Sequence, residues 1–329
     1  MADRILVTGA NGFVGSALCH QLRSSGLLVR GAVRDRVKLP QNDTSESNNL
    51  EWVVLHDRSP EDETKEAMQG MRAVVHLAAR VHVMTDDASD PLHEFRQVNC
   101  VWTERLARAA ASQGVHRFVY LSSIKVHGEQ SIAPFTEQDL PKPQDPYGIS
   151  KWEAEQVLAQ VSTQTGMETV VVRSPLVYGP GVRGNFLQLL NILPRGIPLP
   201  LASIRNQRSL VYLGNLVDAL VRCIQDSRAA GRTYLVRDGE DLSTPELVRR
   251  LGAAMGSKVC LWPCPTSLLY WMGQVAGKRG MIDRLVGSLQ VNSSKIQTEL
   301  DWHPSFTVAA GLSETAAWFR ARTNGPQYA

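Results

Sequence analysis

The stretch Ile5-Leu6-Val7-Thr8-Gly9-Ala10-Asn11-Gly12-Phe13-Val14-Gly15 decides the fold of this chain. Its apolar start predicts a short strand, and residues 16–24 carry a helical pattern directly after the glycines. In such a turn Gly9 permits the tight bend, Gly12 lets a pyrophosphate approach the backbone, and Gly15 allows tight helix packing. The helix N-terminus adds amides and a positive dipole. The stretch therefore predicts a dinucleotide-binding unit, with an ordinary strand-to-helix turn as the alternative.

Short β-rich runs alternate with helical patterns through the first half of the chain. The predicted strands are Ile5–Val7, Val29–Val33, Trp52–Leu55, Ala73–Leu77, Arg117–Leu121 and Thr169–Val172. Between them, apolar residues at three- and four-residue steps from Phe95 to Ala109 predict an amphipathic helix that ends near Gly114. This alternation predicts an α/β fold built on a Rossmann-type, doubly wound parallel sheet.

The second half of the chain has a different pattern. Beyond about residue 175 the strand–helix alternation loosens into segments punctuated by proline and glycine. We expect residues 1–175 to form the dinucleotide-binding domain. Residues 176–329 should form mainly a smaller, interleaved substrate-binding lobe, with some segments returning to the first domain. The polar stretches Arg36–Asn49 and Ser131–Pro146 are predicted loops.

Composition narrows the class of protein. The 329 residues are 43% hydrophobic and 20% charged, as in soluble globular proteins, and the net charge of +3 has no basic run that would suggest nucleic acid. The eight histidines form no HExxH motif or close His/Asp cluster, so no metal is expected. Five cysteines without a CxxC pair, no signal-peptide pattern and no long apolar span predict a cytoplasmic protein without membrane insertion.

A second motif, Tyr147-Gly148-Ile149-Ser150-Lys151, carries the chemistry. Four-residue spacing puts Tyr147 and Lys151 on one face of a helix that Pro146 begins. Reducing a ketone requires a proton donor beside its oxygen, and an adjacent ammonium tunes a phenol toward neutrality. Ser123 follows a predicted strand, at the sheet edge where such folds bind ligands. We predict Ser123, Tyr147 and Lys151 as the catalytic residues.

The GxxGxxG spacing of the first loop resembles the extended short-chain dehydrogenase/reductase superfamily. Further segments that agree are His76-Leu77-Ala78-Ala79, Ser122–Gly128, Arg173–Pro180 and Leu300–Pro304. The chain is similar to the nucleotide-diphosphate-sugar epimerases, dehydratases and 4-keto reductases of that superfamily. The resemblance implies cofactor contacts from Gly9, Asn11, Gly12, Phe13, Val14, Gly15, Asp57, Leu77, Ala78, Ala79, Tyr147, Lys151, Pro175 and Val177. It also makes Asn99 a buried structural residue, while we expect His76 to be a core histidine.

The resemblance also implies the contacts to a UDP-sugar. Asn185 and Arg208 match the positions that hold the diphosphate, beside Ser123 and Tyr147 at the sugar. A guanidinium suits a pyrophosphate, although Arg208 could instead be a solvated arginine. Arg284 is a weaker candidate for a second contact, because the later segment of the family does not align clearly.

The end of the second predicted strand bears on the choice of cofactor. It reads Val33-Arg34-Asp35-Arg36, with Arg34 in the first position beyond the strand. An arginine there pairs with a 2′-phosphate, so NADP(H) is favoured. NAD(H) remains the alternative, because a shift of one residue would bring Asp35 to the ribose hydroxyl.

The two residues that follow Ser123 bear on the reaction class. Dehydratases of this family carry an Asp-Glu pair there, whereas this chain has Ile124 and Lys125, so elimination of water is disfavoured. Ser123–Gly128 and Pro175–Phe186 resemble bacterial reductases that complete UDP-N-acetylquinovosamine (UDP-QuiNAc) or UDP-N-acetylfucosamine (UDP-FucNAc) for O-antigen of lipopolysaccharide. We therefore expect a 4-keto reductase acting on a UDP-4-keto-6-deoxy-N-acetylhexosamine. A C4 epimerase with tightly bound NAD is the alternative, and a non-catalytic dinucleotide sensor a third. The resemblance further implies a homodimer through residues 94–113 and the YxxxK helix.

Overall fold

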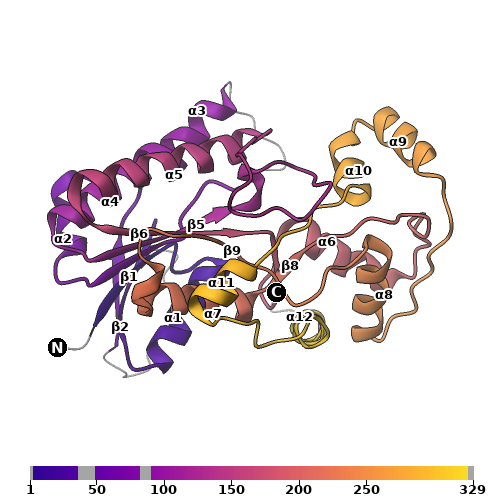
Figure 1. Ribbon diagram of the computed structural model, residues 1–329. Helices are drawn as coiled ribbons and strands as arrows, with labels where there is room; N and C mark the ends of the chain where they lie inside the picture. Colours follow the sequence, from indigo (N-terminus) through magenta and orange to yellow (C-terminus); the bar gives the residue numbers. More distant parts are fainter. Residues whose placement is uncertain (1–2, 36–48, 82–89, 325–329) are drawn as a thin grey trace.

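The computed structural model describes residues 3–35, 49–81 and 90–324 (Figure 1). Its centre is a seven-stranded sheet in the order β3-β2-β1-β4-β5-β6-β9, with every neighbouring pair parallel. The strands are β1 (Arg4–Thr8), β2 (Leu28–Val33), β3 (Leu50–Val54), β4 (Ala73–His76), β5 (Arg117–Ser123), β6 (Glu168–Ser174) and β9 (Thr233–Leu235). The predicted doubly wound parallel sheet is confirmed, and the six predicted strands are all present.

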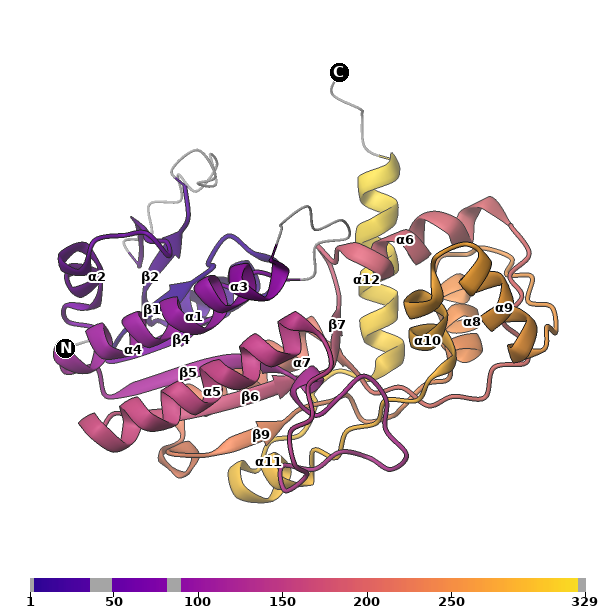
Figure 2. The same ribbon diagram turned by 90° about the horizontal axis from the view of Figure 1, so that it is seen from above.

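Helices cover both faces of this sheet (Figures 1 and 2). One face packs against α1 (Phe13–Ser24), α7 (Leu213–Gln225) and α11 (Ser294–Leu300). The other packs against α2 (Glu61–Met68), α4 (Trp102–Ser112) and α5 (Pro146–Thr165). Side chains alternate between the two cores along each strand, so Ile5 and Val7 face the first group of helices while Leu6 faces the second. Both faces of the strands are therefore buried, as their continuous apolar runs require.

The second half of the chain contributes to both parts of the molecule. β9 pairs with β6 and closes one edge of the sheet, although its three residues gave no strand signal in the sequence. The remaining elements gather at one end of the molecule around a separate core (Figures 1 and 2). They are β7 (Leu176–Tyr178), paired in parallel with β8 (Leu210–Tyr212), α6 (Gly184–Ile192), α8 (Thr244–Ala254), α9 (Thr266–Val275), α10 (Arg279–Val286) and α12 (Val308–Asn324).

Two predicted loops and one predicted helix can be compared with the structure. Residues 131–145 contain no regular helix or strand, as predicted, and α5 begins at Pro146. Of the loop Arg36–Asn49, residues 36–48 lie outside the described part of the chain. The helix predicted from Phe95 to Gly114 is present as α3 (Pro91–Arg96), a π-helical segment (Gln97–Val101) and α4, followed by Gly114 with a left-handed φ of 73°.

The chain reverses its direction of winding between β1 and β4. β2 and β3 follow β1 on one side, whereas β4, β5 and β6 extend the sheet on the other. The chain after β1 leads to α1 on one face of the sheet, and the chain after β4 leads to α4 on the other face, which marks the place where doubly wound sheets bind their ligands. The glycine loop after β1 lies at this position, with α1 packed closely on it because Gly15 has no side chain.

We predict that Gly15→Ala destabilises the protein by about 1–3 kcal/mol, because a Cβ there would lie 2.1 Å from the carbonyl oxygen of Gly9 and the backbone must move. The free energy of unfolding in urea measures this. Gly280→Ala is the matched control, since a Cβ at Gly280 meets nothing within 4 Å. Equal unfolding free energies for the two variants would contradict the packing role of Gly15.

Candidate active site

The predicted site residues gather at the carboxyl ends of four strands. The glycine loop follows β1, Leu77–Ala79 follow β4, Ser123 ends β5, and Pro175 follows β6. Because all four strands are parallel, these ends meet at one edge of the sheet. The first two loops touch: a Cβ on Gly9 would lie 3.0 Å from the backbone nitrogen of Ala78.

The glycine loop leaves an open helix N-terminus. Gly12 caps α1 and has no side chain to accept hydrogen bonds from the amides of the first turn. Gly9 has a left-handed φ of 68°, which makes the tight bend that its residue type predicted. Amides without a side-chain cap at a helix N-terminus suit an anionic group, so this loop fits the pyrophosphate of a dinucleotide.

Thr8 joins the loop after β1 to the loop after β4. Its hydroxyl oxygen lies 3.2 Å from the backbone nitrogens of both Leu77 and Ala78, which donate to it. The same hydroxyl lies 2.6 Å from Nδ1 of His76. These bonds hold the end of β1 and the loop after β4 together.

His76 is a buried structural residue, as the sequence suggested. Its Nε2 lies 2.9 Å from the hydroxyl of Thr103, and its ring stacks on Tyr120 with centroids 5.7 Å apart. Burial and the nearby Lys151 lower the pKa of His76 to about 3, so the ring is neutral. A neutral imidazole with both nitrogens bonded serves packing rather than proton transfer.

Asn99 ties the loop after β4 to the catalytic helix. Its Oδ1 accepts from the backbone nitrogen of Arg80 at 2.8 Å, and its Nδ2 donates to the carbonyl of Arg80 and to the hydroxyl of Ser150, each at 3.0 Å. Asn99 lies in the π-helical segment between α3 and α4, and it is buried. The expected structural role of this residue is confirmed.

Tyr147 and Ser123 are brought together by the start of α5. Asp145 caps this helix by accepting from the backbone nitrogen of Gly148 at 2.6 Å. Gly148 allows the helix to approach the turn after β5, because a Cβ there would lie 2.8 Å from the carbonyl oxygen of Lys125. The hydroxyl of Ser123 lies close enough to the phenol of Tyr147 to lower its pKa, against the larger opposing effects of burial and Asp145. Both are partly accessible, so a ligand can reach this pair of hydroxyls.

Lys151 is buried one turn further along α5. Its ammonium lies 4.2 Å from the ring centroid of Tyr120, and only 2% of the residue is exposed. Burial lowers the pKa of Lys151 to about 7, against the opposing effect of Glu155. Burial and the carboxylate of Asp145 raise the pKa of Tyr147 to about 12. The expectation that Lys151 tunes the phenol toward neutrality is therefore wrong for the nucleotide-free protein, because burial penalises both charged forms.

A buried ion pair lies behind Lys151. Glu155, the next residue on this face of α5, accepts from Nη2 of Arg173 at 2.6 Å and from the hydroxyl of Ser122 at 2.5 Å. Nη1 of Arg173 lies 2.7 Å from Nε2 of His127. Burial and then Arg173 lower the pKa of His127 to about 4, so this ring too is neutral. The pair anchors β5, β6 and α5 to one another directly beneath the catalytic side chains.

Lys125 occupies the position where the related dehydratases carry an acid. Its ammonium lies 2.7 Å from Glu129 and 2.5 Å from Asp145, the residue that caps α5. The half-buried triad joins the turn after β5 to the start of the catalytic helix. Its cation is thus already bound by two carboxylates of the chain itself.

The substrate candidates lie in the second part of the chain. Nη1 of Arg208 donates to the carbonyls of Arg284 and Gly287, at 2.8 and 3.0 Å, and burial lowers the pKa of this guanidinium. The alternative that Arg208 is a solvated arginine is wrong, since Arg208 is partly buried and held by α10. The charge of Arg284 also lowers the pKa of Arg208. Asn185 is exposed on the first turn of α6.

The residues linked to adenosine are more exposed. Arg34 directly follows β2 and is exposed, as is Asp35, while Arg36 lies outside the described residues. Asp57 is partly exposed, and its backbone carbonyl accepts from Arg105 at 2.8 Å. These positions follow the carboxyl ends of β2 and β3.

Sequence reasoning missed four residues that shape the site: Thr8, Lys125, Asp145 and Glu155. Asp145 had a readable signal, because an aspartate directly before a proline is typical of a helix cap followed by Pro at the first helical position. The roles of Lys125 and Glu155 depend on partners 20 and 18 residues away across the fold, and no local pattern indicates them.

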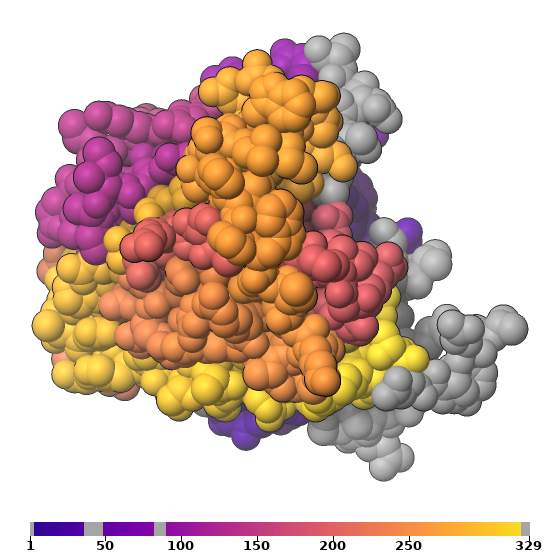
Figure 3. Space-filling view, turned by 90° about the vertical axis from the view of Figure 1, so that its right-hand side faces the viewer, coloured from indigo at the N-terminus to yellow at the C-terminus, as the bar shows by residue number. Residues whose placement is uncertain are grey.

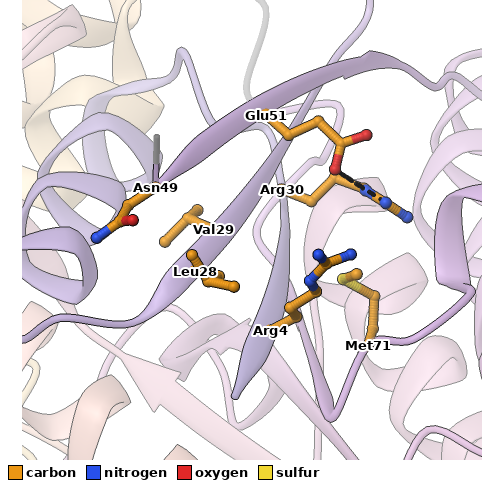
Figure 4. Close-up of a pocket in the computed structure, with 7 residues that line it drawn as sticks. All are labelled: Arg4, Leu28, Val29, Arg30, Asn49, Glu51 and Met71. Atoms are coloured by element: carbon orange, nitrogen blue, oxygen red, sulfur yellow. Dashed lines mark hydrogen bonds and ion pairs between the residues drawn. The ribbon is translucent and has the colours of Figure 1, made fainter. Parts of the chain in front are cut away.

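A pocket at the other edge of the sheet is not the active site (Figure 4). It is lined by residues at or near the amino ends of β1, β2 and β3, including Arg4, Leu28 and Met71. Arg30 and Glu51 in this pocket pair with each other at 2.9 Å.

In the described ranges the chain has no group of three or more residues able to hold a metal ion. Within those ranges, too, no helix has the length and apolar character to cross a membrane.

This fold and site are those of a known class of protein. Residues 5–236 match the NAD dependent epimerase/dehydratase family, and the chain belongs to this family. It is 40% identical over 328 residues to a UDP-glucose 4-epimerase of Vibrio cholerae, with 98% of each chain covered. It is 26% identical over 333 residues to the N-acetyl-alpha-D-glucosaminyl-diphospho-ditrans,octacis-undecaprenol 4-epimerase of Escherichia coli O157:H7, covering 96% of this chain and 95% of that one.

Solved structures agree with the fold. MoeE5 in complex with UDP-glucuronic acid and NAD superposes with a TM-score of 0.77 at 25% identity, covering 97% of this chain and 99% of that chain. UDP-glucose 4-epimerase of Thermotoga maritima with UDP-glucose has a TM-score of 0.78 at 21% identity, covering 97% and 99%, and shows the shared fold alone. The relatives are NAD-dependent enzymes of nucleotide sugars, and so is this chain. They give no support to the NADP preference or to the 4-keto reductase.

The pKa of Lys151 predicts how stability depends on pH. In the folded, nucleotide-free protein it is about 7, against an ordinary value of 10.5. Between these values the unfolded chain holds a proton that the folded chain has lost, so folding is favoured as pH rises. We predict that the unfolding free energy of the wild type, relative to Lys151→Met, increases from about pH 7 to about pH 10. Urea unfolding across this range measures it, and parallel curves for the two proteins would contradict the lowered pKa.

Proposed function

We propose that this chain interconverts UDP-hexoses that differ in configuration at C4, with NAD held tightly through the reaction. The observation that carries the proposal is the grouping of Ser123, at the end of β5, with Tyr147 and buried Lys151 on α5, at the carboxyl edge of the sheet. The 40% identity to a UDP-glucose 4-epimerase, over nearly the whole of both chains, supports this reaction over the 4-keto reductase that the sequence favoured.

In the proposed mechanism each catalytic residue has a separate task. Ser123 orients the C4 oxygen of the sugar through its hydroxyl. Tyr147 takes the proton of that oxygen as C4 is oxidised and returns it on reduction. When bound in its oxidised form, NAD would supply the hydride acceptor for C4. Lys151 would add positive charge beside the phenol of Tyr147 and would help to hold the cofactor.

The pKa values of Tyr147 and Lys151 explain why the phenol needs positive charge nearby. Tyr147, with a pKa of about 12, is almost wholly protonated at neutral pH and is a poor base. Lys151, at about 7, is charged in only part of the molecules. A bound anionic dinucleotide favours the ammonium form of Lys151, which in turn favours the phenolate. Cofactor binding and activation of the base are therefore linked in this proposal.

Lys125 supports an epimerase or reductase rather than a dehydratase. Removing water across C5 and C6 requires a further acid and base near the sugar. The cation of Lys125 is bound to Glu129 and Asp145, so it is not placed to act as that base. The reductase that would form UDP-QuiNAc or UDP-FucNAc with NADPH remains a second candidate, supported by exposed Arg34 directly beyond β2.

For the substrate, we propose that Arg208 and Arg284 bind the diphosphate of UDP, with Asn185 as a third contact. Arg208 donates to the backbone carbonyls of Arg284 in α10 and of Gly287 directly after it, and the charge of Arg284 lowers the pKa of Arg208. Bringing two cations together costs free energy without a ligand, and a doubly charged pyrophosphate between them relieves it.

We also propose that the protein is a homodimer that pairs through α4 and α5. The two helices lie side by side on the same face of the sheet (Figure 2). Val101, at the start of α4, is 42% exposed although it is apolar. A second copy of the helix pair would cover it.

The decisive experiment incubates purified protein with UDP-glucose and no added nucleotide, and follows UDP-galactose by chromatography. Interconversion, with NAD released on denaturation, supports the epimerase, and UDP-N-acetylglucosamine tests a larger sugar in the same way. Consumption of NADPH with a UDP-4-keto-6-deoxy-N-acetylhexosamine, and no interconversion, would instead identify the reductase.

Tyr147→Phe should lower turnover by about two orders of magnitude or more while retaining NAD, the effect of losing a general acid and base.

We predict that Arg208→Gln raises KM for the UDP-sugar about tenfold to 150-fold with a smaller change in kcat, because a charged hydrogen bond is worth about 1.5–3 kcal/mol. Arg205→Gln is the matched control, since Arg205 is exposed nearby on the same segment. Thermal unfolding separates loss of binding from loss of folding. A KM for Arg208→Gln equal to that of the control would remove Arg208 from the diphosphate site.

A further inference from the structure

Helix α9 presents an apolar stripe to solvent. Leu268, Trp271, Met272 and Val275 are 41%, 63%, 46% and 71% exposed. Their spacing of three and four residues places them on one face of α9. A stripe of this kind predicts a helix face that is buried against the protein, yet here it faces outward.

The opposite face of α9 fixes this orientation. Leu269 is 4% exposed and belongs to the core of the second part of the chain. Gly273 is buried against α10, where a Cβ would lie 2.4 Å from Cγ1 of Ile282. Turning the stripe inward would remove Leu269 from the core and bring larger side chains against Ile282. The helix is therefore attached by one face and exposes another that is equally apolar.

Positive charge surrounds the stripe. Lys278 and Arg279 are exposed just after the end of α9, Lys258 is exposed in the segment that leads to it, and Asp283 is the one acidic residue between Ser257 and Gly287. Trp262, just before the helix, is a further 43% exposed aromatic side chain. Exposed tryptophan and aliphatic residues beside lysine and arginine are typical of helices that lie in the interface of an anionic bilayer.

We propose that α9 docks this protein on the surface of a lipid bilayer that contains anionic headgroups. The helix lies in the plane of the interface, with the stripe among the acyl chains and Lys258, Lys278 and Arg279 at the phosphates. Its ten residues, Thr266–Val275, are far fewer than the about 20 needed to span a bilayer, so docking is peripheral. α9 and α10 form the end of the molecule remote from β1 (Figure 1), and Figure 3 shows residues 250–290, in orange, on the surface of that end.

Docking would also place the proposed diphosphate site near the membrane. α10 packs on α9 through Ile282 and Gly273, and its Arg284 carbonyl binds Arg208. This proposal goes beyond the epimerase reaction, since it concerns where the protein acts and not which bond it changes.

A second copy of this chain fits the stripe less well. A stable dimer buries about 800 Å² on each partner, more than four half-exposed side chains supply. A two-fold contact through α9 would also bring the cations of both copies together, whereas anionic lipid headgroups neutralise them.

The test is co-sedimentation of the full chain with vesicles of phosphatidylcholine alone and of phosphatidylcholine mixed with phosphatidylglycerol. We expect binding to the anionic vesicles, weaker binding to the neutral ones, and loss of binding at high salt. Trp271→Ser combined with Val275→Ser should lower the affinity at least about tenfold, since each side chain loses apolar burial. Ile132→Ser with Leu140→Ser is the matched control, because those apolar residues are 107% and 77% exposed and belong to the loop before α5 and not to α9.

Each outcome decides the proposal. The control variant should bind vesicles as the wild type does, and both variants should keep wild-type turnover of the dissolved substrate. Failure of the wild type to sediment with anionic vesicles, or equal binding by the α9 variant, overturns the proposal. A lower mass of the α9 variant in light scattering, without vesicle binding by the wild type, would assign the stripe to a second copy instead.

Discussion

The pairing of β1 with β4 is the constraint on which the rest of the molecule depends. The sheet extends from this pair in two directions, and the helices that follow the two strands lie on opposite faces of the sheet. Thr8 then holds the two loops together by accepting from the backbone of Leu77 and Ala78. The glycine loop and the catalytic residues on β5 and α5 all lie along the carboxyl edge of the sheet.

Burial governs the electrostatics of the site. Lys151, Glu155 and Arg173 are charged or chargeable groups within the core, and they are tolerated because Glu155 and Arg173 bind each other and Ser122. The same burial lowers the pKa of Lys151 and raises that of Tyr147, because both charged forms are penalised in the core.

In the second part of the chain, the proposed diphosphate site and the proposed docking helix are linked by α10. α10 contacts Arg208 on one side and α9 on the other, so the same short helix supports the proposed diphosphate site and the exposed apolar stripe. Lys125 has two consequences. It stands where the sequence comparison with dehydratases expects an acid, and it binds Asp145, the cap of α5. Small changes at such shared positions distinguish reactions within a family whose central sheet is the same.

The sequence by itself determined the doubly wound sheet, the glycine loop, the order of Ser123, Tyr147 and Lys151, and the structural role of His76. These are local features, because strand periodicity, glycine spacing and helix spacing are set by near neighbours along the chain. Only the tertiary structure decided the position of β9, whose three residues are too few for a pattern, and the contacts of Lys125 and Glu155 with distant partners. It alone also decided that the stripe of α9 faces outward. Periodicity shows that one face of a helix is apolar, but the packing of Leu269 and Gly273 chooses which face is buried.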